Sequence, residues 1–388
     1  MKLAERMQRL GTETAFVVLA RANQLQAEGK DIIHLEIGEP DFATPKYICD
    51  AASKAIKDGF THYNPAPGYP DVRKVISEEV SKTRRINITP EQVVITPGGK
   101  PIMFFTIFAL VDAGDEVIYP NPGFPIYESL INFVNAKSVP IRLREENDFR
   151  LDVKELKSLI TPKTKLMIIN SPQNPTGGVL THEDLKEIAR LAVENDIWVL
   201  SDEIYSRIIY ETKFESLTQF PGMPERTIIL DGMSKTYAMT GWRLGYGVMN
   251  EKLASQVARL QTNCTSCTAA FSQKALAAAI TGPQDEAYEM VREFKRRRDV
   301  IVDGLNQIDG ISCRKPLGAF YVFPNVKSFG KTSKELEEIL LEEYGVAALA
   351  GTSFGAFGEG YLRFSYANSV ENIRKAIQRI KEAAGKLR

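Results

Sequence analysis

One lysine stands where an amine could act as a nucleophile. Lys235 comes soon after an apolar run, Ile228–Leu230, that predicts a buried strand. Its neighbours are small or apolar, and the cation Arg243 follows eight residues later. An apolar setting and a nearby cation both disfavour the ammonium form, and an amine attacks a carbonyl only after losing that proton. A solvated lysine in a loop is the alternative for this residue taken alone.

Three polar side chains follow other predicted strands. Asp202 and Tyr205 come directly after the apolar run 197–201, and Asn174 follows the run 165–170. A buried carboxylate can keep a pyridine nitrogen protonated, while a tyrosine hydroxyl and an amide can hydrogen-bond a phenolic oxygen. Each residue also has a purely structural alternative, a helix N-cap for Asp202 and a turn for Asn174.

Two glycine-containing stretches could bring the backbone close to a ligand. Residues 98–101, Gly-Gly-Lys-Pro, precede an apolar helix, so the amides of that turn are free to bind a phosphate. An ordinary helix start is the alternative. Residues 38–42, Gly-Glu-Pro-Asp-Phe, predict an irregular loop that either approaches a ligand or simply turns the chain. Tyr63 lies in a proline-rich stretch that predicts an exposed loop.

The elements that must position these residues alternate between strand and helix. Strands are predicted at 93–96, 116–119, 139–143, 165–170, 197–201, 227–230 and 244–249. Strands that alternate with helices specify a mainly parallel sheet covered on both faces. Ligands bind such sheets beyond the carboxyl ends of the strands, which is where the candidate residues between 98 and 235 fall.

The pattern changes after residue 282. Short strands are predicted at 318–323, 346–350 and 361–365, between a long charged helix over 285–305 and a terminal amphipathic helix, with an N-terminal strand at 32–37. We therefore expect a small α+β domain of residues 1–45 and 282–388, and a large domain of residues 46–281. The basic run 295–298 is expected on a solvated helix face.

Composition excludes several classes of protein. The 388 residues are 44% hydrophobic and 25% charged, and 49 basic residues balance 49 acidic ones, so the charge predicts neither nucleic-acid nor membrane binding. The start lacks the apolar core of a signal peptide, and a cytoplasmic location is expected. Four cysteines make no disulfide framework in a chain of this size. Cys264 and Cys267 have redox spacing but no accompanying ligands, and no metal site is predicted.

Several motifs together resemble those of one enzyme family. Residues 232–245, Gly-Met-Ser-Lys through Gly-Trp-Arg-Leu-Gly, resemble the lysine-attachment signature of class I pyridoxal phosphate-dependent aminotransferases. Residues 174–177, Asn-Pro-Thr-Gly, and 202–205, Asp-Glu-Ile-Tyr, resemble the other two hallmarks in the right order. The loop 38–42 and Arg363 extend the resemblance over nearly the whole chain.

The resemblance implies a fold, a cofactor and an assembly. It implies a large domain with a mostly parallel seven-stranded sheet flanked by helices, a small domain formed by both chain termini, and a homodimer with shared active sites. Lys235 would form a Schiff base with pyridoxal 5'-phosphate and shuttle the proton, and Arg363 would bind the substrate α-carboxylate. The other implied contacts are Gly38 and Asn174 on the substrate, Asp202, Tyr205, Asn174 and Phe124 on the cofactor ring, Gly99, Lys100, Ser234 and Arg243 on the phosphate, and Tyr63 from the partner subunit.

The substrate is less closely defined. Gly232 stands where some members carry serine, and Phe124 where tryptophan or tyrosine is common. Lys100 resembles a lysine that receives the distal carboxylate in one aspartate aminotransferase branch, which favours aspartate or glutamate with 2-oxoglutarate; reinforcement of the phosphate site is the alternative. Nearby aromatic residues also permit aromatic or broad specificity. A carbon–sulfur lyase or cyclase on the same fold, and a non-catalytic regulatory domain, are the other classes considered.

Overall fold

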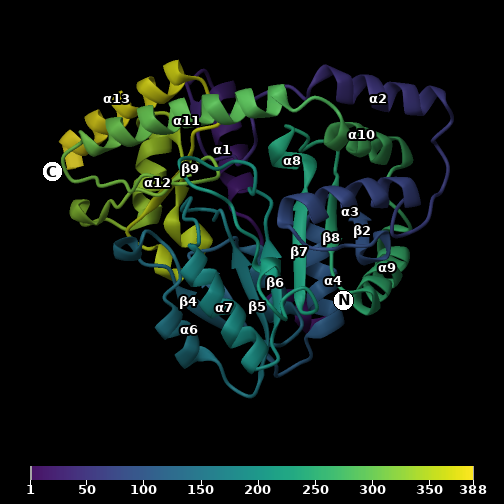
Figure 1. Cartoon of the computed structure of the whole chain (residues 1–388). Helices are drawn as coiled ribbons and strands as arrows, with labels where there is room; N and C mark the ends of the chain where they lie inside the picture. Colours follow the sequence, from purple (N-terminus) through teal and green to yellow (C-terminus); the bar gives the residue numbers. More distant parts are fainter. Residues whose placement is uncertain (1, 388) are drawn as a thin grey trace.

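A seven-stranded sheet forms the centre of the molecule (Figure 1). The computed structural model describes residues 2–387. The strand order is β2-β8-β7-β6-β5-β3-β4, and only β8 runs antiparallel to its neighbours. The expected mostly parallel seven-stranded sheet is thus confirmed. The strands are β2 (Val93–Thr96), β3 (Glu116–Asn121), β4 (Lys137–Arg142), β5 (Thr164–Asn170), β6 (Trp198–Asp202), β7 (Thr227–Gly232) and β8 (Gly245–Val248).

Helices cover both faces of this sheet because successive strand residues point to opposite sides. Val117 packs into one apolar cluster with α4 and α9, and its neighbour Ile118 packs into another with α7. Both side chains are fully buried. The helices of this part are α2 (Lys46–Lys57), α3 (Pro70–Arg84), α4 (Lys100–Leu110), α5 (Ile126–Phe133), α6 (Val153–Leu159), α7 (His182–Glu194), α8 (Met233–Thr236), α9 (Glu251–Thr265) and α10 (Ala270–Thr281).

Both ends of the chain meet in two small sheets. β1 (Ile33–His34) pairs with β10 (Val346–Ala347), and β12 (Leu362–Ser365) lies between β11 (Leu349–Ala350) and β9 (Tyr321–Val322). The helices here are α1 (Ala15–Ala27), α11 (Asp285–Asn306), α12 (Ser333–Glu342) and α13 (Val370–Leu387). Figure 1 shows α11 and α13 side by side, and one apolar cluster joins Ile33 and Leu35 to these helices. The domain boundaries themselves remain a prediction.

Three predicted strands of the terminal part differ most from the observed ones, while the others differ only at their ends. The stretches 32–37 and 318–323 each contain only two residues in strand conformation, and 346–350 is split into β10 and β11. The split arises because the backbone changes partners, from β1 to β12, within a few residues. Single turns of 3-10 helix connect the elements at Glu5–Arg9, Pro90–Gln92, Glu145–Asn147, Leu217–Gln219, Lys327–Phe329, Gly351–Phe354 and Ala356–Gly358.

The expectation of a solvated basic face at 295–298 was wrong for two of its residues. Arg298 is 0% exposed, bonds Glu211 at 2.8 and 2.9 Å, and stacks 4.7 Å from the ring centroid of Tyr210. Arg297 is also buried and pairs with Asp41 at 2.6 Å. Partners from distant parts of the chain neutralise these guanidinium groups, which lets them leave water.

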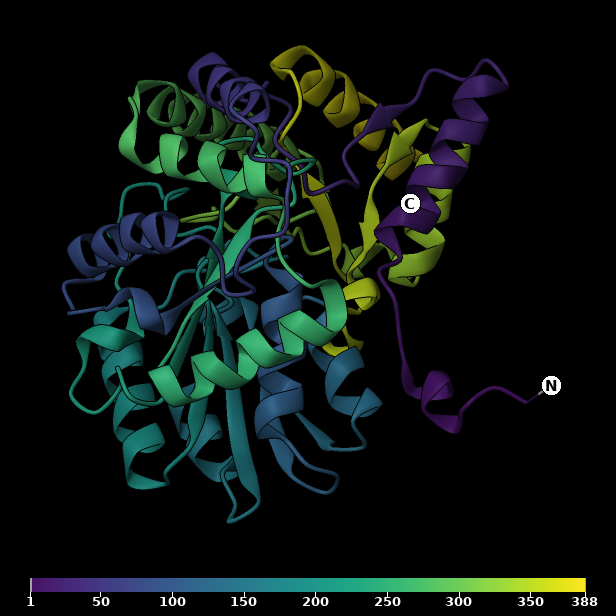
Figure 2. The same ribbon diagram turned by 90° about the vertical axis from the view of Figure 1, so that its right-hand side faces the viewer.

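The N-terminal segment leaves α1 as an arm that lies against α5 (Figure 2). Arg9 donates to the carbonyl of Asn132 at 3.0 Å, and the Gly11 amide donates to the Ser129 hydroxyl at 2.9 Å. Within residues 2–387, no helix is both long and apolar enough to cross a bilayer. The cysteines are free thiols, and the described chain contains no cluster of metal-ligating side chains.

Candidate active site

A cavity of about 560 Å³ opens at the carboxyl ends of β5, β6 and β7. Its far wall comes from the small sheets, through Tyr321, Leu349 and Arg363. Parallel strands bring their carboxyl ends to one edge, so residues distant in sequence meet here. Of the predicted site residues, the structure places these in the lining: Gly38, Gly99, Lys100, Phe124, Asn174, Asp202, Tyr205, Ser234, Lys235, Arg243 and Arg363.

Lys235 extends into this cavity from α8, directly beyond β7. Its ammonium group donates to the carbonyl of Gly38 at 2.5 Å. The pKa of Lys235 is lowered to about 8, mainly by burial, with Glu39 opposing the shift and Arg363 adding to it. The cations that help are therefore Arg363 and Lys100, in place of the predicted neighbour Arg243. The amine is closer to its neutral form at physiological pH than a solvated lysine is.

Asp202 occupies the last position of β6, on the strand next to β7. Burial raises its pKa to about 6, although Tyr127 donates to the carboxylate at 2.5 Å and the Ile204 amide at 3.3 Å. The neighbouring carboxylates of Asp231 and Glu203 contribute to this raised pKa. A buried carboxylate at a cavity wall with this pKa is suited to a cationic ligand group.

Arg363 presents a partly unsatisfied guanidinium to the same cavity. It is 4% exposed, bonds the Asn174 side-chain oxygen at 3.3 Å and donates to the carbonyl of Glu36. The rings of Tyr321 and Phe354 lie 4.6 and 4.9 Å from its centre. Its Nε is buried and has no hydrogen-bond partner. A buried donor left unpaired is unfavourable, and a ligand carboxylate would satisfy it.

The opposite end of the cavity is built for an anion. α4 begins at Lys100 after Gly99, so free backbone amides point outward. Gly98 has φ +93°, and a Cβ there would lie 2.4 Å from Nη2 of Arg243. A Cβ on Gly245 would lie 2.5 Å from the amide nitrogen of Gly99. Glycines at these positions let the Arg243 guanidinium and the start of α4 converge, as a phosphate site requires.

Sequence reasoning missed an ion pair at the cavity mouth. Glu13, on the arm that precedes α1, pairs with Lys100. The Lys100 ammonium group also lies 5.6 Å from the ring centroid of Phe124. The sequence around Glu13 is a short polar stretch before a helix, which gives no local signal of a partner 87 residues away.

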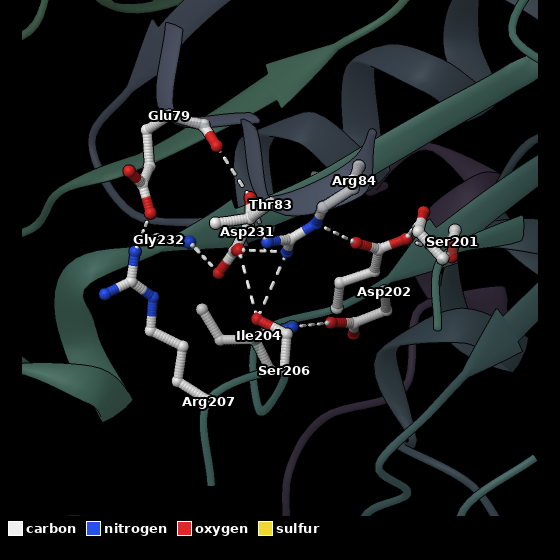
Figure 3. Close-up of polar contacts among 12 residues, drawn as sticks. Glu79, Thr83, Arg84, Ser201, Asp202, Ile204, Ser206, Arg207, Asp231 and Gly232 are labelled. Carbon is white, nitrogen blue, oxygen red and sulfur yellow. Dashed lines mark hydrogen bonds and ion pairs between the residues drawn. The ribbon is translucent and has the colours of Figure 1, made fainter. Parts of the chain in front are cut away.

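A buried ionic cluster beneath the site was also missed. Arg84, at the end of α3, lies 2.9 Å from Glu203 and 2.8 Å from Asp231, and all three side chains are buried. Figure 3 shows Arg84 directed at Asp231 on β7, close to Asp202 on β6. Glu203 immediately follows Asp202, and Asp231 precedes Lys235 by four residues. The cluster therefore ties together the two strand ends that carry the reactive groups.

Tyr63 does not line the main cavity. It is 89% exposed and borders a separate hollow with Phe60, Thr268 and Phe271. The exposed-loop prediction is confirmed, since residues 61–69 contain no helix or strand. Its role at a partner's active site stays a prediction.

Comparison with known proteins agrees with this arrangement. The family model "Aminotransferase class I and II" matches residues 30–380. Aspartate aminotransferase of Pyrococcus abyssi is 42% identical over 357 residues, covering 91% of this chain and 92% of that relative. Aromatic-amino-acid aminotransferase 2 of Thermococcus litoralis is 41% identical over 355 residues, covering 90% of this chain and 91% of that relative. The structure of Thermus thermophilus aspartate aminotransferase with maleate superimposes with a TM-score of 0.94 at 36% identity, covering 98% and 99% of the two chains. The chain therefore belongs to the class I and II aminotransferase family and is an aminotransferase.

Proposed function

We propose that this aminotransferase uses pyridoxal 5'-phosphate, attached through Lys235. The observation that carries the proposal is the placement of a partly buried amine just beyond the end of β7 and a buried carboxylate at the end of the adjacent strand β6, in one cavity. Lys235 would hold the aldehyde carbon, and Asp202 would face the ring nitrogen. Ser234, Arg243 and the amides of Gly99 and Lys100 would bind the phosphate. The unpaired Nε of Arg363 fits a substrate α-carboxylate beside the cofactor.

Each side chain then has a defined task. When bound, the cofactor supplies an electron sink for the charge left by removal of the substrate's α proton. The Lys235 amine accepts and returns that proton, which its lowered pKa of about 8 assists. Arg363 orients the substrate, with Asn174 and the Gly38 backbone beside it. Phe124 would stack on the ring, and Tyr205 and Asn174, which belong to the same lining, would hydrogen-bond its phenolic oxygen.

The amino donors proposed are acidic and aromatic amino acids, with a 2-oxo acid such as 2-oxoglutarate as acceptor. Lys100 is a second cation in the cavity and suits a distal carboxylate. Phe16 and Phe124 in the same lining suit an aromatic side chain. Relatives named for aspartate and for aromatic amino acids support both classes. We propose a homodimer in which Tyr63 of each chain reaches the other chain's cofactor phosphate.

The test is a single-turnover spectral titration of the cofactor-loaded enzyme with aspartate, glutamate, phenylalanine, tyrosine and alanine. The visible absorbance of the bound cofactor should be lost on mixing and restored by 2-oxoglutarate. Lys235→Ala should abolish both the covalent attachment and this cycle, while Lys186→Ala, which removes an exposed lysine paired with Glu183, should leave them intact. Formation of a thiol, pyruvate and ammonia from an S-substituted cysteine, with no amino-group exchange with 2-oxoglutarate, would identify a carbon–sulfur lyase instead.

A further inference from the structure

The ion pair of Glu13 and Lys100 lies inside the cavity that takes the substrate. Both residues belong to the lining, and their side chains are 17% and 43% exposed. The arm that carries Glu13 is fixed two residues earlier, where Gly11 exchanges hydrogen bonds with Ser129 on α5 at 2.9 and 3.2 Å. Glu13 is therefore held over the cavity by the fold of the arm. Its carboxylate is a built part of the site.

The carboxylate of Glu13 acts on the reactive groups as well as on Lys100. It raises the pKa of Lys235 and opposes the lowering of the pKa of Arg363. Glu39, at the other side of the mouth, bonds Thr240 and also raises the pKa of Lys235. Of these two carboxylates, Glu13 is the one paired with Lys100. Glu13 therefore forms an ion pair with the same ammonium group that would bind the distal carboxylate of a dicarboxylic substrate.

We propose that Glu13 is an internal counterion of Lys100 that lets one site accept both acidic and aromatic amino acids. The inference rests on the proposed function and specifies its substrate range. An acidic substrate exchanges its distal carboxylate for that of Glu13 on Lys100, and Glu13 turns out to solvent. An aromatic substrate leaves the pair intact, so its ring packs beside Phe124 without desolvating an unpaired cation. Burying such a cation beside an apolar ring is unfavourable.

The surroundings fit this exchange. Glu13 precedes α1 and lies outside any helix or strand, so a side-chain rotation moves its carboxylate without unfolding an element. Thr14, at the start of α1, makes no side-chain capping bond that would hold the segment rigid. Phe16 on the first turn of α1 is 61% exposed and lines the cavity, which places an apolar surface next to the pair. An acidic substrate side chain would thus contact Lys100, and an aromatic one would contact Phe16, at the same end of the cavity.

The experiment measures two unreactive carboxylates on the cofactor-loaded enzyme by calorimetry. Succinate stands for an acidic substrate and 3-phenylpropanoate for an aromatic one. Glu13→Gln removes the charge at nearly constant shape. The affinity for succinate should rise by about fivefold, and the affinity for 3-phenylpropanoate should fall by up to about fivefold. These changes match the upper end of the free energy of a partly exposed ion pair. The ratio of kcat/KM for aspartate to that for phenylalanine should rise accordingly, mainly through KM.

Two controls isolate the pair. Glu39→Gln removes another carboxylate from the same mouth and should leave the succinate to 3-phenylpropanoate ratio unchanged. In a Lys100→Met background, which lacks the cation, Glu13→Gln should no longer weaken 3-phenylpropanoate. An unchanged ratio in Glu13→Gln, or the same effect with and without Lys100, would overturn the counterion role. The binding measurements test the counterion role of Glu13 whether or not any amino acid undergoes transfer. Absence of transfer with every amino acid would instead refute the proposed function.

Discussion

Asp202→Asn is the sharpest test of the electrostatics at the site. The substitution keeps the shape and can keep the hydrogen bond that the Ile204 amide donates, while the new amide group would donate to the Tyr127 hydroxyl in place of accepting from it, and the acid is removed. In the cofactor-free protein, burial raises the pKa of Asp202 from 3.8 to about 6. The folded state therefore binds a proton more readily than the unfolded state does. Its stabilising contribution is complete below the unfolded pKa and is lost as the pH rises through the folded pKa.

The size of the effect follows from that interval. A difference between 3.8 and about 6 corresponds to ~3 kcal/mol of unfolding free energy over the whole titration. About half of it, ~1.4 kcal/mol, falls between about pH 5 and about pH 7.5, where most proteins remain folded. Asp202→Asn has no proton to lose, so it should gain stability relative to the wild type by that amount across this range.

Urea unfolding of the two cofactor-free proteins, followed by circular dichroism at both pH values, gives the required difference. Because the wild type and the variant share every other titrating group, the pH dependence of the difference between their unfolding free energies reports on the Asp202 carboxyl alone. A difference that stays constant with pH would show that the carboxylate is not desolvated. A constant difference that favours the wild type would show a depressed pKa and a cation that the structure does not place there.

Three further predictions concern the groups around Asp202. Arg84→Met should cost ~3–5 kcal/mol of unfolding free energy at about pH 7.5, because Glu203 and Asp231 lose their buried cation. Burial already raises the pKa of both acids, so they should take up protons at about pH 5, and the loss of stability should be smaller there. An equal loss in urea unfolding at both pH values would contradict this prediction. Arg363→Lys should lower kcat/KM for aspartate and phenylalanine alike, by ~2–4 kcal/mol, since an ammonium group cannot replace the planar fork; a loss limited to aspartate in steady-state assays would assign this residue to the distal carboxylate. Gly98→Ala should weaken cofactor binding at least tenfold, about the effect of 1.4 kcal/mol, because φ is +93° there and the new Cβ meets a guanidinium, and equilibrium dialysis checks it.

The sequence predicted the sheet and most of the site because both depend on local signals. Apolar runs mark buried strands, and the residue after such a run must lie at a strand end. Asp202, Asn174 and Lys235 all follow such runs, so their convergence followed from strand direction alone. Arg363 could not be placed this way, since it lies on a short strand of another sheet and was located only through the family resemblance.

The partners of these residues could not be predicted, because pairing over long distances depends on how helices pack. Tyr127 reaches Asp202 across 75 residues, and Arg84 reaches Asp231 across 147. Tyr127 and Arg84 both lie on helices, and the sequence around them gives no sign of their distant partners. Arg298 was misjudged for the same reason, since its partner Glu211 lies 87 residues away. Charge runs identify solvated faces only where no distant acid neutralises them.

Cofactor binding should change the pH dependence that Asp202 gives to the stability of the protein. Without a ligand, Asp202 makes no salt bridge with any described residue, the pKa of Lys235 is lowered to about 8, and Arg363 keeps an unpaired Nε. A protonated ring nitrogen beside Asp202 would favour the ionised acid, lower its pKa below 3.8 and reverse the sign of its contribution. Loaded with pyridoxal phosphate, the wild type should therefore keep a constant stability difference from Asp202→Asn between about pH 5 and about pH 7.5, because a depressed pKa titrates below this range. A loaded wild type that still lost stability over this range would show that the carboxylate meets no cation in the complex.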